Sequence, residues 1–193
     1  MTARPEVLLA VDRAVRWPQS SGVLRRVAGP AFTVEAGEGL SWFDPLDGVP
    51  AATSEIAAGT VATFATAVEW PEGYPDGLSG AAVGLGDPAA VVSWDATGEF
   101  SVDRGVGCVV LSRHVERVAR GLQDFANVRP VLDGVRASMV HPLAVGDLVV
   151  GVAFHCGMGS STNRVHEGRD ASGTVVALLA DLDLLTRAEL EPS

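Results

Sequence analysis

The stretch TVATFATAVE, residues 60–69, indicates the fold class of this chain more clearly than any other. It alternates in part between apolar and polar side chains and is rich in the β-branched residues Thr and Val, so it predicts a β-strand. Shorter apolar runs predict further strands, and TVVALLA from residue 174 predicts a buried strand near the C-terminus. These other strands are expected at residues 31–35, 81–85, 89–94, 100–103, 107–111, 135–140 and 147–156.

Two short helices are expected beside these strands. Apolar residues recur at helical spacing over residues 5–16, and again over residues 115–125 after Ser112, a suitable N-cap. Turns are expected at residues 44–48 and 95–98, and a loop at residues 71–77. No repeat or linker interrupts the chain, so residues 1–193 are predicted to form one domain. The predicted class is α+β and β-rich: antiparallel sheets, as a sandwich or open barrel, with the two helices at the edge.

The composition excludes several kinds of function. Acidic residues exceed basic ones, which gives a net charge of −10, and this disfavours nucleic acid and anionic membranes as partners. All 14 basic residues are arginine. Without lysine, the chain cannot form the Schiff base of pyridoxal phosphate enzymes or the phosphate contact of a P-loop.

The location of the protein is predicted from its cysteines and its hydropathy. Cys108 and Cys156 fit no zinc-binding spacing, and we expect them to be reduced thiols in the cytoplasm. The N-terminus lacks the apolar core of a signal peptide, and no run of about 18 apolar residues appears. The sequence does not indicate an oligomeric state.

Three segments carry a resemblance to a known family. They read DPLDGVP at residues 44–50, FSVDRGVGCVVL at 100–111 and GMGSSTNRVHEGRDASGTVVALLADLDLL at 157–185. In this order and spacing they resemble the bacterial family catalogued as domain of unknown function 4241, over about residues 44–185. The resemblance implies a fold class and supplies no catalytic residues.

The third segment also departs from the family pattern, which implies a divergent member. Its matching positions are Gly157, Gly159, Gly168 and Asp170. Its departures are Cys156 and Ser160 where the family tends to have Ser and Asp, Asn163 and Arg164 in place of Tyr-Pro, and Glu167 in place of an aromatic residue.

Most of the reactive side chains gather in residues 155–170, which we expect to form a β-hairpin around a glycine-rich turn. Such a turn can present backbone N–H groups to an anion, and a nearby imidazole can act as a general acid or base. The candidate catalytic residues are His155, His166, Arg164, Glu167 and Cys156. The candidate ligand-binding residues are Ser160, Ser161, Asn163 and Trp94.

Each feature of this segment also has a purely structural interpretation. Cys156 suits a small buried apolar residue, because free cysteines are commonly buried, and the glycine turn suits an ordinary hairpin loop. His155 and His166, facing each other across a hairpin, could hold a transition metal with a carboxylate, but no HExxH or similar spacing is present. We therefore predict no metal and no cofactor.

Two functions remain open. The first, which we prefer because the reactive residues gather in one segment, is an enzyme that acts on a small molecule, as in specialised metabolism, with His166 in acid–base work and Arg164 stabilising an anion. The second is a non-catalytic binding, immunity or regulatory protein that meets a basic partner through its acidic surface. An enzyme requires a concave pocket that holds these groups, whereas a binding protein can present a flat acidic patch.

Overall fold

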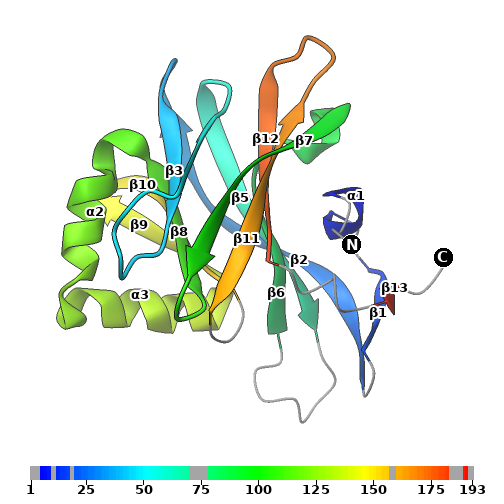
Figure 1. The fold of residues 1–193 in the computed structure, drawn as a ribbon, viewed down its shortest axis with the longest axis horizontal. Helices are drawn as coiled ribbons and strands as arrows, with labels where there is room; N and C mark the ends of the chain where they lie inside the picture. Colours follow the sequence, from blue (N-terminus) through cyan, green and yellow to red (C-terminus); the bar gives the residue numbers. More distant parts are fainter. Residues whose placement is uncertain are drawn as a thin grey trace.

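A computed structural model describes residues 5–9, 12–17, 20–69, 78–156, 160–182 and 189–190. Two antiparallel sheets make up most of it, which confirms the predicted β-rich class (Figure 1). In spatial order the larger sheet contains β13 (Glu189–Leu190), β1 (Ala14–Trp17), β2 (Ser20–Val34), β5 (Gly59–Glu69), β6 (Leu78–Gly86), β12 (Val175–Asp181), β11 (Ser161–Arg169) and β7 (Ser93–Val102). The smaller sheet contains β4 (Ala52–Glu55), β3 (Gly39–Phe43), β8 (Val106–Leu111), β10 (Leu148–His155) and β9 (Val140–Val145).

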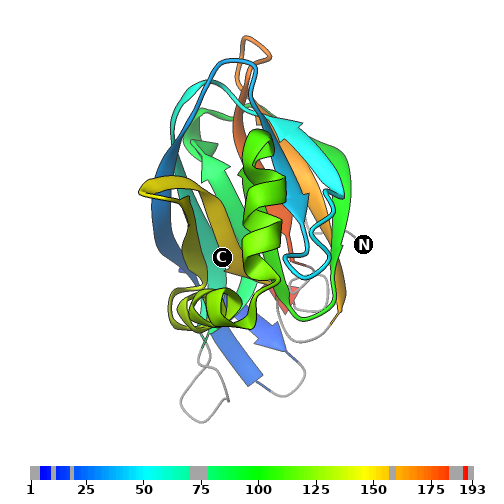
Figure 2. The same cartoon turned by 90° about the vertical axis from the view of Figure 1, so that its left-hand side faces the viewer.

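The helical elements are α1 (Pro5–Leu8), α2 (Val115–Leu122), α3 (Phe125–Ser138) and the 3-10 turns η1 (Pro88–Ala90) and η2 (Ser112–His114). Two helices, α2 and α3, cover the smaller sheet on the side away from the larger one, as Figure 2 shows from that side, whereas α1 and η1 contact β12 of the larger sheet. The chain buries Val115, Val118, Ala119 and Leu122 along one stripe of α2, at helical spacing. None of the helices in the described residues is long and apolar enough to cross a bilayer.

The main core lies between the two sheets. Its centre is a cluster of three aromatic rings from three strands: Trp42 of β3, Phe100 of β7 and Phe154 of β10. A second, smaller group of buried side chains, the outer cluster, lies on the opposite face of the larger sheet. It contains Leu8, Val15, Leu24, Phe64, Val68, Ala81, Ala82 and Leu179.

Several predicted strands are confirmed. The stretch at residues 60–69 forms most of β5, and residues 31–35 fall largely in the longer β2. The runs at 81–85 and 107–111 lie within β6 and β8, and the apolar run from residue 174 gives β12. The turn at residues 44–48 is confirmed by a hydrogen bond in which Gly48 N donates to Asp44 O at 2.9 Å. The loop expected at residues 71–77 lies outside the described residues.

Other local predictions are wrong. The expected N-terminal helix is helical only from Pro5 to Leu8; Ala14–Trp17 is β1, because its main chain pairs with β2. Residues 95–98 form no turn, because β7 runs through them with a bulge opposite Val165 and His166. The strand predicted at 89–94 is wrong in its first half, because residues 89 and 90 belong to η1, and right only at 93–94, where β7 begins.

The second helical region also differs from expectation. Residues 135–138 end α3, and only Val140 begins a strand, so the strand predicted at 135–140 is wrong. The first turn of α3 is capped by Asp124, whose side chain accepts a hydrogen bond from Ala126 N. Ser112 caps no helix. Its hydroxyl lies 2.8 Å from the Ser41 hydroxyl and so joins η2 to β3.

Gly151 gives a sharp test of the packing within the smaller sheet. A Cβ atom at this position would lie 2.2 Å from Val109 O and 2.6 Å from Val110 Cα, and main chain cannot move aside as a flexible side chain can. We expect Gly151→Ala to lower the free energy of unfolding by about 2 kcal/mol or more. The matched control is Gly121→Ala in α2, where an added Cβ would meet nothing within 4 Å beyond its chain neighbours and the backbone of its own helix, so alanine should stabilise the helix by about 1 kcal/mol. Urea unfolding followed by tryptophan fluorescence measures both, and equal effects would contradict this packing.

Candidate functional site

The predicted hairpin at residues 155–170 does not form. β10 pairs with β8 and β9 in the smaller sheet, whereas β11 pairs with β12 and β7 in the larger one. The chain therefore crosses from one sheet to the other between His155 and Ser161, and Gly157–Gly159 lie outside the described residues. As a result, His155 and His166 do not face each other across a hairpin.

The alternation of β11 divides the remaining candidates between two faces. Val165 and its neighbour Ala180 on β12 belong to the core between the sheets. His166 is paired with Leu179 of the outer cluster, so it and Arg164 lie on the opposite, outer face. Ser161, Asn163 and Glu167 share the inner face with Val165. The structure thus brings Arg164 and His166 to one face and separates them from Glu167.

The polar candidates make contacts that hold the strands together. Arg164 donates to Glu99 Oε1 on β7 from Nε at 3.3 Å and from Nη2 at 3.1 Å. Glu167 Oε2 accepts a hydrogen bond from Arg169 Nη2 at 2.6 Å. Asn163 is fully buried, and its Oδ1 accepts from the Ser161 hydroxyl at 3.3 Å. These contacts are cross-strand or local pairs of the kind that stabilise sheets.

Two further candidates lie at the margins of the larger sheet. The Ser160 hydroxyl donates to Asp103 O at 3.4 Å on an exposed surface. Trp94 is paired with Gly168, where an added Cβ would lie 2.9 Å from the indole ring, and it packs beside the outer cluster. Gly168 therefore leaves room for the indole.

Cys156 is a buried core residue, which was the structural alternative to a catalytic role. It is 4% exposed and belongs to the core between the sheets. Burial raises the pKa of its thiol far above the ordinary value, and burial does the same for Cys108. The nucleophilic form of cysteine is the thiolate, so a buried thiol with a raised pKa is poorly suited to attack a substrate.

Asp170 also has a structural role. Its Oδ1 accepts hydrogen bonds from the Ser172 hydroxyl at 2.6 Å, from Ser172 N at 2.8 Å and from Thr174 N at 3.0 Å. The hydroxyl bond is the main cause that lowers the pKa of this carboxyl, and the backbone bonds add to it. Asp170 therefore shapes the tight turn between β11 and β12.

An open depression of about 530 Å³ lies elsewhere, where the β3–β4 turn meets the edge strand β7. Its walls combine carboxylates with apolar side chains, and it receives one residue from β11. The lining residues are Asp44, Asp47, Val49, Pro50, Ala51, Glu99, Phe100, Ser101 and Thr162. The hydroxyls of Ser101 and Thr162 lie 3.0 Å apart on neighbouring strands.

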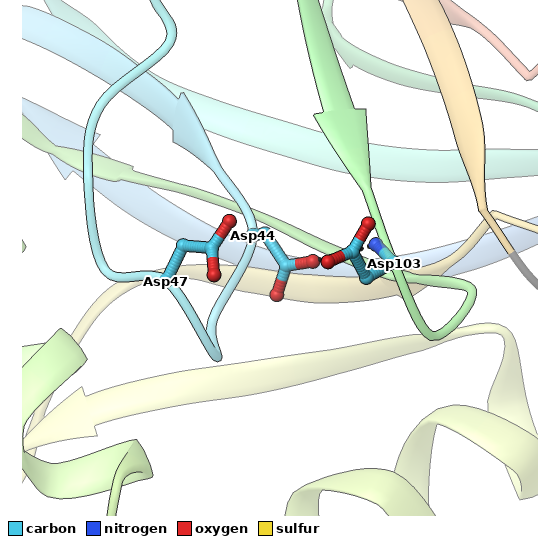
Figure 3. A group of neighbouring side chains, drawn as sticks. All are labelled: Asp44, Asp47 and Asp103. Atoms are coloured by element: carbon cyan, nitrogen blue, oxygen red, sulfur yellow. Dashed lines mark hydrogen bonds between the residues drawn. The ribbon is translucent and has the colours of Figure 1, made fainter.

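Asp44 and Asp47 of this depression, together with Asp103, form a group of three carboxylates (Figure 3). One oxygen from each lies within 4.8 Å of the others. Asp44 is 4% exposed, and its two oxygens accept from Leu46 N and from Asp103 N, each at 2.7 Å. Asp44 thus ties the β3–β4 turn to the turn after β7, as expected for an aspartate in a turn. Asp47 and Asp103 are exposed.

The chemistry of this group of carboxylates suits a positively charged ligand. Carboxylate oxygens accept hydrogen bonds from guanidinium and ammonium groups, and they can also ligate hard metal ions. The exposed side chain of Val49, 67% accessible, adds an apolar wall beside them. An aliphatic stem that ends in a positive charge matches both parts of the lining.

The sequence contained only part of the signal for this depression. The turn DPLDG places Asp44 and Asp47 three residues apart, and both were expected in a turn. Glu99 and Thr162 come from distant segments and are joined to the turn by the packing of β7 against the smaller sheet and by the hydrogen bond from Asp103 N to Asp44. The chain matches no family model, no curated protein and no solved structure. The resemblance to domain of unknown function 4241 therefore stays a prediction.

Replacing Asp44 by Asn tests its role in the two turns. The amide retains one acceptor oxygen, but its NH₂ group would face a backbone N–H donor in place of the second oxygen. We expect Asp44→Asn to lower the free energy of unfolding by about 1–2 kcal/mol. Asp47→Asn removes the same charge from an exposed position and should change the free energy of unfolding by less than about 0.5 kcal/mol. If chemical denaturation finds the two variants equally stable, the assigned bonds of Asp44 are wrong.

The buried thiols predict both reactivity and pH dependence. In the native protein at pH 8, Cys108 and Cys156 should fail to react with Ellman's reagent, and both should react in denaturant. Above the usual thiol pKa of 9.0, the unfolded chain releases protons that the folded protein keeps. Stability should therefore be unaffected by the thiols below that pH and fall above it, by about 1.4 kcal/mol per pH unit for each thiol. If Cys156→Ala leaves the fall of stability with pH above the usual thiol pKa unchanged, this account is contradicted.

Proposed function

We propose that the protein is a non-catalytic binding protein that holds a positively charged group of its partner in the depression beside β7. The observation that carries the proposal is the lining itself, in which Asp44, Asp47 and Glu99 flank an apolar wall that includes Val49 and Pro50. An arginine or lysine side chain fits such a lining, because its aliphatic stem contacts apolar surface and its charged end meets carboxylates. The net charge of −10 would also steer a basic partner toward the protein.

Three finer parts of the proposal follow from the same surface and from the cysteines. The surplus of carboxylates opposes phosphate, so we propose a protein partner in preference to nucleic acid. Both cysteines are free thiols, which supports a reducing compartment and hence the cytoplasm. Membership in domain of unknown function 4241 is proposed on the sequence motifs alone.

An enzyme that acts on a small molecule is a second candidate. Arg164 and His166 share the outer face of β11, and Asp181 is paired with Arg164 across the neighbouring strand. His166 and Asp181 are both buried, and buried ionisable groups near one another are frequent in active sites. Consumption of a small molecule that Arg164→Ala abolishes would favour this candidate. The depression, in contrast, holds none of the residues predicted to be catalytic.

The binding proposal is tested by calorimetry with a hexapeptide of alternating arginine and threonine. We expect the wild-type protein to bind it, with an affinity that falls as NaCl is raised, because exposed charges are screened by salt. The double variant Asp47→Asn, Glu99→Gln should weaken binding by about tenfold. The matched control is Glu116→Gln together with Asp133→Asn on α2 and α3, which removes the same charge at two positions that do not line the depression. Equal weakening by both double variants would show only a general charge effect and would reject the site.

A further inference from the structure

β7 is the longest edge strand among the described residues, and its protection consists of one bulge near Thr97 and two acidic side chains, Asp95 and Glu99. The two sheets end in four edge strands, and three of them are short or contain proline: β13 has two residues, β4 has four and β9 has six, with Pro142 among them. β7 has ten residues and no proline, and β11 is its one paired neighbour in the described sheet. Sheets usually protect their edges by short strands, prolines, bulges or charges, because unpaired main chain can bind another strand.

The part of β7 beyond its bulge borders the depression. Glu99, Phe100 and Ser101 line it. The side chain of Phe100 is 1% exposed and packs in the core between the sheets, so Phe100 must line the depression with its main chain. The depression therefore offers both carboxylates and strand-edge main chain to the same ligand.

The charge of β7 indicates which kind of strand can pair with it. Its sequence, SWDATGEFSV, carries Asp95 and Glu99 and no basic residue. Paired in parallel and in register, or antiparallel about Thr97, a second copy of β7 would place like charges opposite each other, which destabilises strand pairing. A basic segment would instead place a cation beside Glu99, on the side away from Arg164, which already contacts Glu99 from β11.

We propose that the partner binds as an extended, basic segment that adds a strand to β7 at residues 98–101 and places its charged side chain in the depression. The inference rests on the proposed function and adds the mode of recognition. Main-chain hydrogen bonds to β7 would supply affinity, and the pockets for alternate side chains would supply specificity. Because alternate side chains of a strand point to one side, the segment should carry its basic residues at every second position.

The experiment uses the arginine–threonine hexapeptide and two backbone N-methylated forms of it. One form is methylated at the arginine amides and the other at the threonine amides, so both keep the charge and the composition. Alternate amides of a strand point to opposite edges, so only one form should lose its bonds to β7. We expect that form to bind about tenfold more weakly or worse, while the other binds like the unmodified peptide. Amide hydrogen exchange at residues 98–101 should slow when the unmodified peptide binds.

The possible outcomes separate the two proposals. If the unmodified peptide binds and both methylated forms bind equally well, recognition is by charge alone; the strand addition is then wrong and the binding function stands. If the unmodified peptide does not bind, the proposed function fails. If the protein alone forms dimers in sedimentation and exchange is slowed at residues 98–101, a second copy occupies β7, and the inference is overturned.

Discussion

The contact between three aromatic rings joins the two sheets, and the rest of the structure depends on it. The centroid of the Phe100 ring from β7 lies 5.6 Å from that of Trp42 and 5.9 Å from that of Phe154. The centroids of Trp42 and Phe154 are 6.0 Å apart. All three are buried, and aromatic pairs at such distances contribute about 0.5–1.5 kcal/mol each beyond the burial of their area. Trp42 also donates from Nε1 to the Ser54 hydroxyl of β4 at 3.2 Å, which attaches the edge of the smaller sheet to the same cluster.

This contact places the depression as well as the core. Asp44 follows Trp42 by two residues, and Phe100 lies between Glu99 and Ser101. Once the rings pack, the ends of β3 and β7 must lie side by side, with their polar neighbours at the surface. The bond from Asp103 N to Asp44 then closes the junction. A buried apolar contact therefore positions a polar surface, and the acidic lining needs no strong attraction of its own to be held together.

The sequence predicted the β-rich class because period-two patterns and β-branched residues are local signals. It also predicted the α2 stripe and the turn at Asp44, which depend on nearest neighbours. It failed where the outcome depends on distant partners. α3 contains Pro130, and the apolar residues at its end fit a strand as well as a helix. β1 lies in a segment whose apolar spacing fits a helix, and only its pairing with β2 makes it a strand.

The candidate site shows the same division. Reactive residues that are close in sequence, from His155 to Glu167, were expected to be close in space because the two strands would form a hairpin. β10 is mostly apolar and lies between β8 and β9 in the smaller sheet. β11 lies between β12 and β7 in the larger sheet. No local sequence pattern predicts that these two consecutive strands join different sheets. The alternation of side chains between the two faces of a strand can be predicted from sequence, however, and it places Arg164 and His166 on the face opposite Glu167. The residues that line the depression are too far apart in sequence to form a recognisable motif.

The crossing between β10 and β11 and the ring contact it permits can be tested together by NMR. Nuclear Overhauser effects should connect the indole protons of Trp42 with the rings of Phe100 and Phe154, and backbone effects should connect β11 with β7 and β12. Backbone effects between β10 and β11, with none between Trp42 and Phe100, would show a hairpin in place of the crossing and would contradict the account.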